Sequence, residues 1–78
     1  MTLENMVREA LRVSPDFELL DSHGPAELEE WDSLAHATIM LGVESEYSVV
    51  PTIEEVVSIE TLGDLREFLK KNGVGEDS

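Results

Sequence analysis

Ser33 and its neighbours are the residues whose types and spacing point most directly to chemistry. Asp32 precedes this serine, and His36 follows it by three positions. A catalytic serine and histidine need a third orienting group and an oxyanion hole, and nothing in the sequence marks either. We therefore predict no catalytic residue and expect His36 to be packed or hydrogen-bonded. Asp and Ser are also preferred caps at the start of a helix, so residue type and position alone favour capping by Asp32 and Ser33.

The other candidate residues indicate structure rather than a site. Glu27, Glu29 and Glu30 lack the alternating ligands and central glycine of a calcium loop, so we expect a solvated acidic edge and no metal site. We expect His23 to be solvated and Trp31 to anchor packing in the core or the loop. The sequence contains no cysteine, which excludes disulfides and any chemistry on a protein thiol.

Helical periodicity predicts the elements that position these residues. A first helix is expected from Leu3 to about Val13, with Thr2 as its N-cap, followed by a long connection over residues 15–32. Because that connection holds scattered apolar side chains, we expect it to pack on the bundle. A second helix is predicted from Asp32 or Ser33 to about Tyr47. A short helix is predicted over residues 53–57 and a last one after a cap at Thr61, with Asp64 completing a weaker capping box.

The fold class that follows is an all-α bundle of three to four helices with a long first loop. We expect one domain over residues 1–78, with an ordered core over about residues 2–71. Gly73 suits the end of the last helix, and residues 74–78 are predicted to form a flexible tail.

The second helix carries apolar residues on two opposite sides. One side should face the core, and it contains Ile39, Met40, Val43 and Tyr47. The opposite side should face solvent, and it contains Leu34, Thr38, Leu41 and Ser45. Isolated surface leucines are common, so periodicity alone leaves open whether Leu34 and Leu41 form a docking surface for a partner.

The charge balance is strongly acidic. The 78 residues include 5 Lys and Arg and 18 Asp and Glu, which gives a net charge of -13. Such a surface repels nucleic acid and anionic membranes and attracts basic patches on other proteins, although acidity can also serve solubility alone. The 41% of apolar residues argues against disorder. With neither a transmembrane run nor a signal peptide, the expected location is the cytoplasm.

The run Trp31-Asp32-Ser33-Leu34 resembles the attachment signature of the acyl carrier protein family, which includes peptidyl and aminoacyl carriers. The resemblance continues from Leu34 to the acidic end of the second helix and its closing Tyr47. Val50-Pro51 then matches the family's entry into the short helix, and the segment from Ile59 to Leu65 matches its entry into the last helix. The resemblance covers about residues 2–71 and implies the helical bundle of this family.

In that family a transferase moves 4'-phosphopantetheine from coenzyme A onto the serine hydroxyl, and the arm then holds cargo as a thioester. The resemblance therefore implies that Ser33 is the attachment site, with Asp32 and Leu34 beside it. It also implies a partner-binding surface on the second helix, at Leu34, Thr38, Leu41 and Glu44. The implied partners are a phosphopantetheinyl transferase, an acyl- or aminoacyl-loading enzyme, and downstream synthase or transferase enzymes with basic patches. The carrier itself is expected to be a non-catalytic monomer.

Three positions depart from the pattern of fatty-acid carriers. Thr38 replaces a glutamate that is common there, and Trp31 and His36 are also unusual. The run from Trp31 to His36 resembles discrete carriers from natural-product biosynthesis or aminoacyl transfer more than fatty-acid carriers. The alternatives are a fatty-acid carrier, an acidic interaction module of the same fold without an arm and, last, a small hydrolase using Ser33 and His36.

Overall fold

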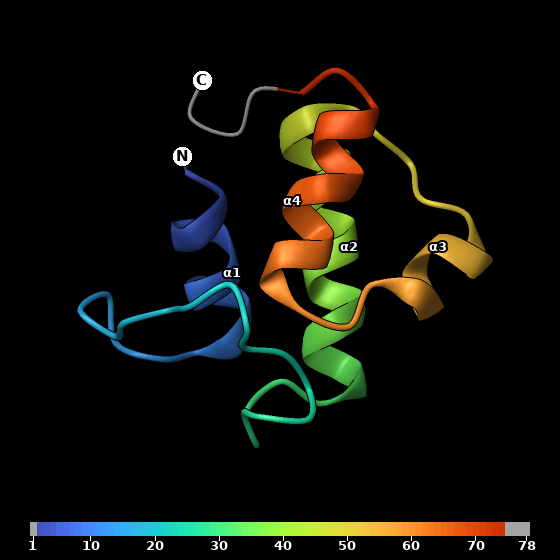
Figure 1. Cartoon of the computed structure of the whole chain (residues 1–78). Helices are drawn as coiled ribbons and strands as arrows, with labels where there is room; N and C mark the ends of the chain where they lie inside the picture. Colours follow the sequence, from blue (N-terminus) through green and yellow to red (C-terminus); the bar gives the residue numbers. More distant parts are fainter. Residues whose placement is uncertain (1, 75–78) are drawn as a thin grey trace.

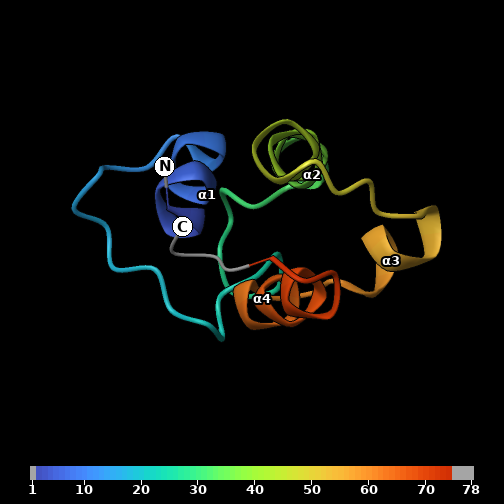
Figure 2. The same ribbon diagram turned by 90° about the horizontal axis from the view of Figure 1, so that it is seen from above.

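Helices α1, α2 and α4 pack around one apolar core, and the short helix α3 lies beside α2 and α4 (Figures 1 and 2). This computed structural model describes residues 2–74. The helices span Leu3–Leu11 (α1), Ser33–Tyr47 (α2), Ile53–Ser58 (α3) and Leu62–Lys71 (α4). Figure 1 shows that α2 and α4 run in the same direction and that α1 runs against them. The prediction of an all-α bundle with a long first loop is confirmed within the described residues.

A polar side chain begins each helix by accepting a hydrogen bond from the backbone N–H three residues later. The four N-caps are Thr2, Asp32, Thr52 and Thr61. Thr2 and Thr61 were predicted as caps, and at α2 the sequence left open whether Asp32 or Ser33 is the cap. Sequence analysis missed the full capping box that Thr52 forms with Glu55 at α3.

Two predicted helix ends need correction. α1 ends at Leu11, before the predicted Val13, because Arg12 adopts a left-handed conformation with φ of 61° and closes the helix. At the start of α4, the Asp64 carboxylate accepts from the N–H of Glu60 instead of that of Thr61, so the expected box is displaced by one residue. Gly73, with φ of 76°, follows α4 as predicted.

The core draws on all three long helices and on the first loop. Its fully buried side chains are Leu3, Val7, Trp31, Ile39, Val43, Leu62, Leu65 and Leu69. The predicted inner side of α2 is confirmed, with Tyr47 packed at its edge. Val74, which was predicted to belong to a flexible tail, instead packs against the core and donates its N–H to the carbonyl of Leu69. The rest of that predicted tail lies outside the described residues.

The first loop packs on the bundle as expected. Leu19 and Trp31 are buried and Phe17 and Leu28 are partly buried, whereas Leu20 remains 46% exposed. The loop also completes the start of α4, because the carbonyls of His23 and Asp21 accept from the N–H groups of Leu62 and Gly63, both at 2.9 Å.

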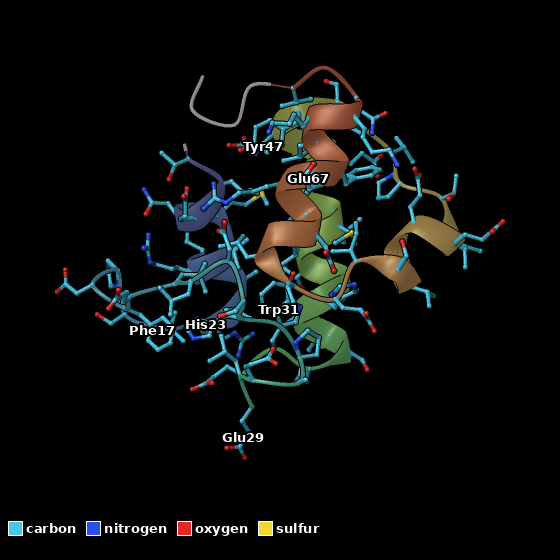
Figure 3. The ribbon with its side chains drawn as sticks, viewed as in Figure 1. Phe17, His23, Glu29, Trp31, Tyr47 and Glu67 are labelled. Atoms are coloured by element: carbon cyan, nitrogen blue, oxygen red, sulfur yellow. The ribbon has the colours of Figure 1, made fainter. Side chains whose placement is uncertain are left out.

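His23 is only partly solvated and has a structural role, which differs from the prediction of a solvated side chain. Its ring is half-buried, and its Nδ1 accepts from the N–H of Leu20 at 3.0 Å. The Phe17 ring lies 6.0 Å away between centroids (Figure 3). His23 therefore holds the loop in a turn.

Gly24 allows the loop to approach the backbone just before α4 closely. A Cβ at this position would lie 1.9 Å from the carbonyl oxygen of Glu60, which is a backbone atom. We predict that Gly24→Ala lowers the free energy of unfolding by about 2 kcal/mol, because the two backbones must separate. Urea denaturation measures this change.

Gly42→Ala is the matched control. Its Cβ would meet the Sδ of Met6 at 2.7 Å, but Met6 is a flexible side chain, and alanine favours a helix interior by about 0.5–1 kcal/mol relative to glycine. We expect the control to change stability less than Gly24→Ala does. Equal losses in the two variants would contradict the close backbone approach.

Arg66 of α4 joins two other parts of the chain. It pairs with Glu4 of α1 and donates from Nε to Asp21 of the loop at 2.8 Å. The hydrogen bond from Arg66 lowers the pKa of the half-buried Glu4 carboxyl below its ordinary value of 4.5.

This lowered pKa predicts a pH-dependent contribution to stability. The ionised Glu4 stabilises the fold above pH 4.5, and that stabilisation is lost as the pH falls through the lower folded-state pKa. Glu4→Gln should therefore lower the free energy of unfolding by about 1 kcal/mol at pH 7 and by progressively less in acid. Denaturation at a series of pH values measures this difference. Glu9→Gln, at an exposed position of α1, should show almost no effect, and an identical pH profile for the two variants would contradict the assignment.

Candidate functional site

At the start of α2, one residue caps the helix and the next one exposes its hydroxyl. Asp32 is the N-cap, and its Oδ1 accepts from the N–H of Ala35 at 2.8 Å. Ser33 is the first helical residue and is exposed. Among residues 2–74, its hydroxyl makes no hydrogen bond. The capping interpretation therefore holds for Asp32 and not for Ser33, whose hydroxyl faces solvent without a structural task.

The backbone at this end of α2 has donors available for an anion. The N–H of Ala35 bonds to the Asp32 carboxylate, and that of His36 bonds to the Asp32 carbonyl at 2.9 Å. Within the described chain this leaves the N–H groups of Ser33 and Leu34 without a partner. Together with the positive end of the helix dipole, they fit a phosphate attached to the Ser33 oxygen.

Trp31 and His36 form a hydrogen-bonded bridge next to Ser33. The indole Nε1 of Trp31 lies 2.9 Å from His36 Nδ1, and His36 Nε2 lies 2.9 Å from the carbonyl oxygen of Val56 in α3. Both ring nitrogens of His36 are thus occupied, which confirms the predicted hydrogen-bonded histidine. Trp31 is only 1% exposed and anchors the core, as predicted (Figure 3).

A groove of about 710 Å³ opens beside Ser33, between the end of the first loop and α3. It includes the three members of the bridge, and its other lining residues are Pro25, Ala26, Glu29, Asp32, Ser33, Val57, Ile59 and Glu60. Sequence analysis did not predict this groove, because its two walls lie more than 20 residues apart in the chain. Glu29 points away from the bundle in Figure 3, consistent with a solvated acidic edge.

The outer side of α2 exposes the predicted partner-binding residues. Leu34 and Leu41 are 71% and 66% exposed, and Thr38 and Glu44 are also exposed. The Thr38 hydroxyl donates to the carbonyl of Leu34 at 2.9 Å. Two further apolar residues are exposed on α3, where Ile53 and Val57 are 85% and 73% exposed. The sequence placed these two on a short helix but did not assign them to a surface.

The charges are distributed unevenly along the chain. All five Lys and Arg lie on α1, on α4 or at Arg12, the residue that closes α1. Residues 13–65 carry 13 Asp and Glu and no basic residue. The segment that contains Ser33, the groove and α3 therefore accounts for the whole net charge of the protein.

The described residues contain neither a metal-binding cluster nor a membrane-spanning helix. No cluster of three or more His, Asp or Glu side chains between residues 2 and 74 is placed to hold a metal ion. None of the helices in this range has the length and apolar character needed to cross a membrane.

Comparison with solved structures identifies the fold. A Mycobacterium tuberculosis protein assigned as an acyl carrier protein superposes with a TM-score of 0.78 at 17% identity, covering 88% of this chain and 90% of its own. The holo acyl carrier protein from Geobacter metallireducens superposes with a TM-score of 0.77 at 22% identity, covering 90% of this chain and 83% of its own. No protein-family model and no curated protein matches the sequence. The chain therefore has the acyl carrier protein fold, which confirms the predicted architecture.

The different tasks of Asp32 and Ser33 predict different effects on stability. Asp32→Ala should lower the free energy of unfolding by about 1 kcal/mol, because the N–H of Ala35 loses its cap. Ser33→Ala should leave stability nearly unchanged, because the hydroxyl makes no hydrogen bond in the described chain. Thermal or urea denaturation compares the two variants, and a comparable loss for Ser33→Ala would show that its hydroxyl has a structural role.

Proposed function

We propose that this protein is a non-catalytic carrier that bears 4'-phosphopantetheine on Ser33 and delivers thioester-bound intermediates to partner enzymes. The observation that carries this proposal is the exposed Ser33 hydroxyl, which lies at the first position of α2 without an internal hydrogen bond. The acyl carrier protein fold of the chain supports the same function.

The attachment reaction uses the geometry at the start of α2. In the active site of a transferase, the Ser33 oxygen attacks the phosphorus that carries pantetheine in coenzyme A, and the serine proton passes to a base of the transferase. The pyrophosphate P–O bond breaks, adenosine 3',5'-bisphosphate leaves, and a phosphodiester remains on Ser33. The N–H groups of Ser33 and Leu34 and the helix dipole stabilise this anion by roughly 0.3–1 kcal/mol at an exposed position. When attached, the arm supplies the thiol that the chain lacks.

We also propose how the partners bind. The exposed Leu34, Thr38 and Leu41 on α2 offer an apolar strip, with Glu44 at its edge. Because residues 13–65 contain no Lys or Arg, basic patches on the transferase, the loading enzyme and the downstream synthases would be attracted to this side. Asp32 remains exposed beside Ser33 and is available to the basic groups or metal of the transferase.

The pathway we propose is natural-product biosynthesis or aminoacyl transfer, with the carrier acting as a discrete monomer in the cytoplasm. Trp31, His36 and Thr38 support it, since these residues depart from the pattern of fatty-acid carriers. Fatty-acid synthesis is the second candidate, because the fold serves both kinds of carrier.

The proposal is tested by incubating the purified protein with coenzyme A and a promiscuous phosphopantetheinyl transferase. Intact mass spectrometry should show the addition of one phosphopantetheine, and Ser33→Ala should abolish it. Ser45→Ala removes another exposed hydroxyl of α2 and should be modified like the wild type.

Two results would contradict the carrier function. One is an unmodified wild-type chain in a reaction that fully modifies a known carrier. The other is modification that persists in Ser33→Ala. An interaction module without an arm would give the first result.

A further inference from the structure

We propose that the Trp31–His36–Val56 bridge determines which cargo this carrier accommodates. It closes the inner wall of the groove beside Ser33, so that compact cargo lies in the groove and long acyl chains are kept out of the helical core. This inference rests on the proposed attachment of an arm to Ser33. It assigns a specificity role to Trp31 and His36 that the attachment reaction does not require.

The chemistry of the three groups fixes the direction of both hydrogen bonds. An indole N–H can only donate, so Nδ1 of His36 must accept from Trp31. The proton of the neutral His36 ring is then on Nε2, which donates to the carbonyl oxygen of Val56. One side chain of α2 thus links the residue before the cap to α3.

Within residues 2–74, the carbonyl of Val56 has no other helical partner. Val56 lies near the end of α3, and the regular helical donor to its carbonyl would be the N–H of Glu60, four residues later. That N–H donates instead to Oδ2 of Asp64 at 3.0 Å. His36 therefore donates to a carbonyl oxygen of α3 that has no donor within the helix. The bridge also holds α3 in place, which matters because this six-residue helix has no buried residue.

The bridge lies where the groove meets the core. Trp31 and Ile59 line the groove and are also core residues, 1% and 4% exposed. Ser33, Asp32 and Val57 lie at the exposed side of the same groove. When the arm on Ser33 folds back along the groove, cargo on its thiol can therefore contact Ala26, Val57 and Ile59 without disturbing the fold, and the groove has a volume of about 710 Å³.

A longer chain meets a barrier at this wall. To reach the core it must separate Trp31 from His36, or His36 from Val56, which leaves a buried donor or acceptor unpaired. That cost opposes the gain from burying additional methylene groups. We therefore expect the stability of the loaded carrier to be independent of acyl length as long as the bridge is intact.

The experiment loads the full chain with acetyl and octanoyl forms of the arm, using the corresponding coenzyme A thioesters and a promiscuous transferase. Mass spectrometry verifies each form. Trp31 is the only tryptophan, so its indole N–H gives one signal in a proton–nitrogen NMR spectrum. In the wild type, the position of this signal and the Tm should be the same for both cargoes.

His36→Ala removes the bridge and opens space at the groove wall. Glu46→Ala, the control, also truncates a side chain of α2, but at an exposed position that does not line the groove. In His36→Ala, the octanoyl form should melt roughly 4–8 °C above the acetyl form, because the longer chain now gains burial. Glu46→Ala should resemble the wild type, with no dependence of the Tm on acyl length.

Three results would overturn the inference. The first is a wild-type octanoyl form with a higher Tm than the acetyl form, and the second is a shift of the wild-type indole signal on octanoyl loading. The third is a folded His36→Ala variant whose Tm does not depend on acyl length. Failure of both thioesters to load would instead overturn the attachment of the arm, and the inference with it. The wild-type comparison remains decisive if His36→Ala does not fold.

Discussion

The hydrogen bond from the N–H of Ala35 to the Asp32 carboxylate fixes where α2 begins, and the geometry of the site depends on it. It places Trp31 before the helix, where its indole is buried, and Ser33 at the first helical position, where its hydroxyl is exposed. Within three residues the chain passes from the core to the solvent. The proposed attachment of an arm needs a serine that is both accessible and firmly placed, and this short transition supplies one.

The second constraint is the attachment of α3. This helix has six residues and is too short to be stable alone, so its position depends on tertiary contacts. The Thr52–Glu55 capping box closes one end, and His36 binds the Val56 carbonyl near the other. The exposed Val57 is thereby held at the groove that Ser33 also lines. One histidine thus connects α2, beside Ser33, with α3.

Much of the fold could be predicted because it follows from local chemistry. The caps at Thr2 and Thr61 and the two sides of α2 depend on residue type and spacing alone. The exposure of Ser33 follows from the same rules once Asp32 is the cap. Contacts between distant residues could not be predicted in this way. The pairing of Arg66 with Glu4, the hydrogen bond of His36 to Val56 and the packing of Val74 join residues whose proximity depends on how the helices assemble. His23 was misjudged for the same reason, since its neighbours Phe17 and Leu20 approach it only when the loop folds back.

The central claim is that the Ser33 oxygen carries a phosphodiester in the living cell. Its most direct test is tandem mass spectrometry of peptides from the protein isolated from the organism that makes it. Our account predicts a phosphopantetheine group localised to Ser33, with any bound cargo on its thiol. A Ser33 peptide found only in unmodified form, while other carriers in the same extract bear their arms, would contradict it.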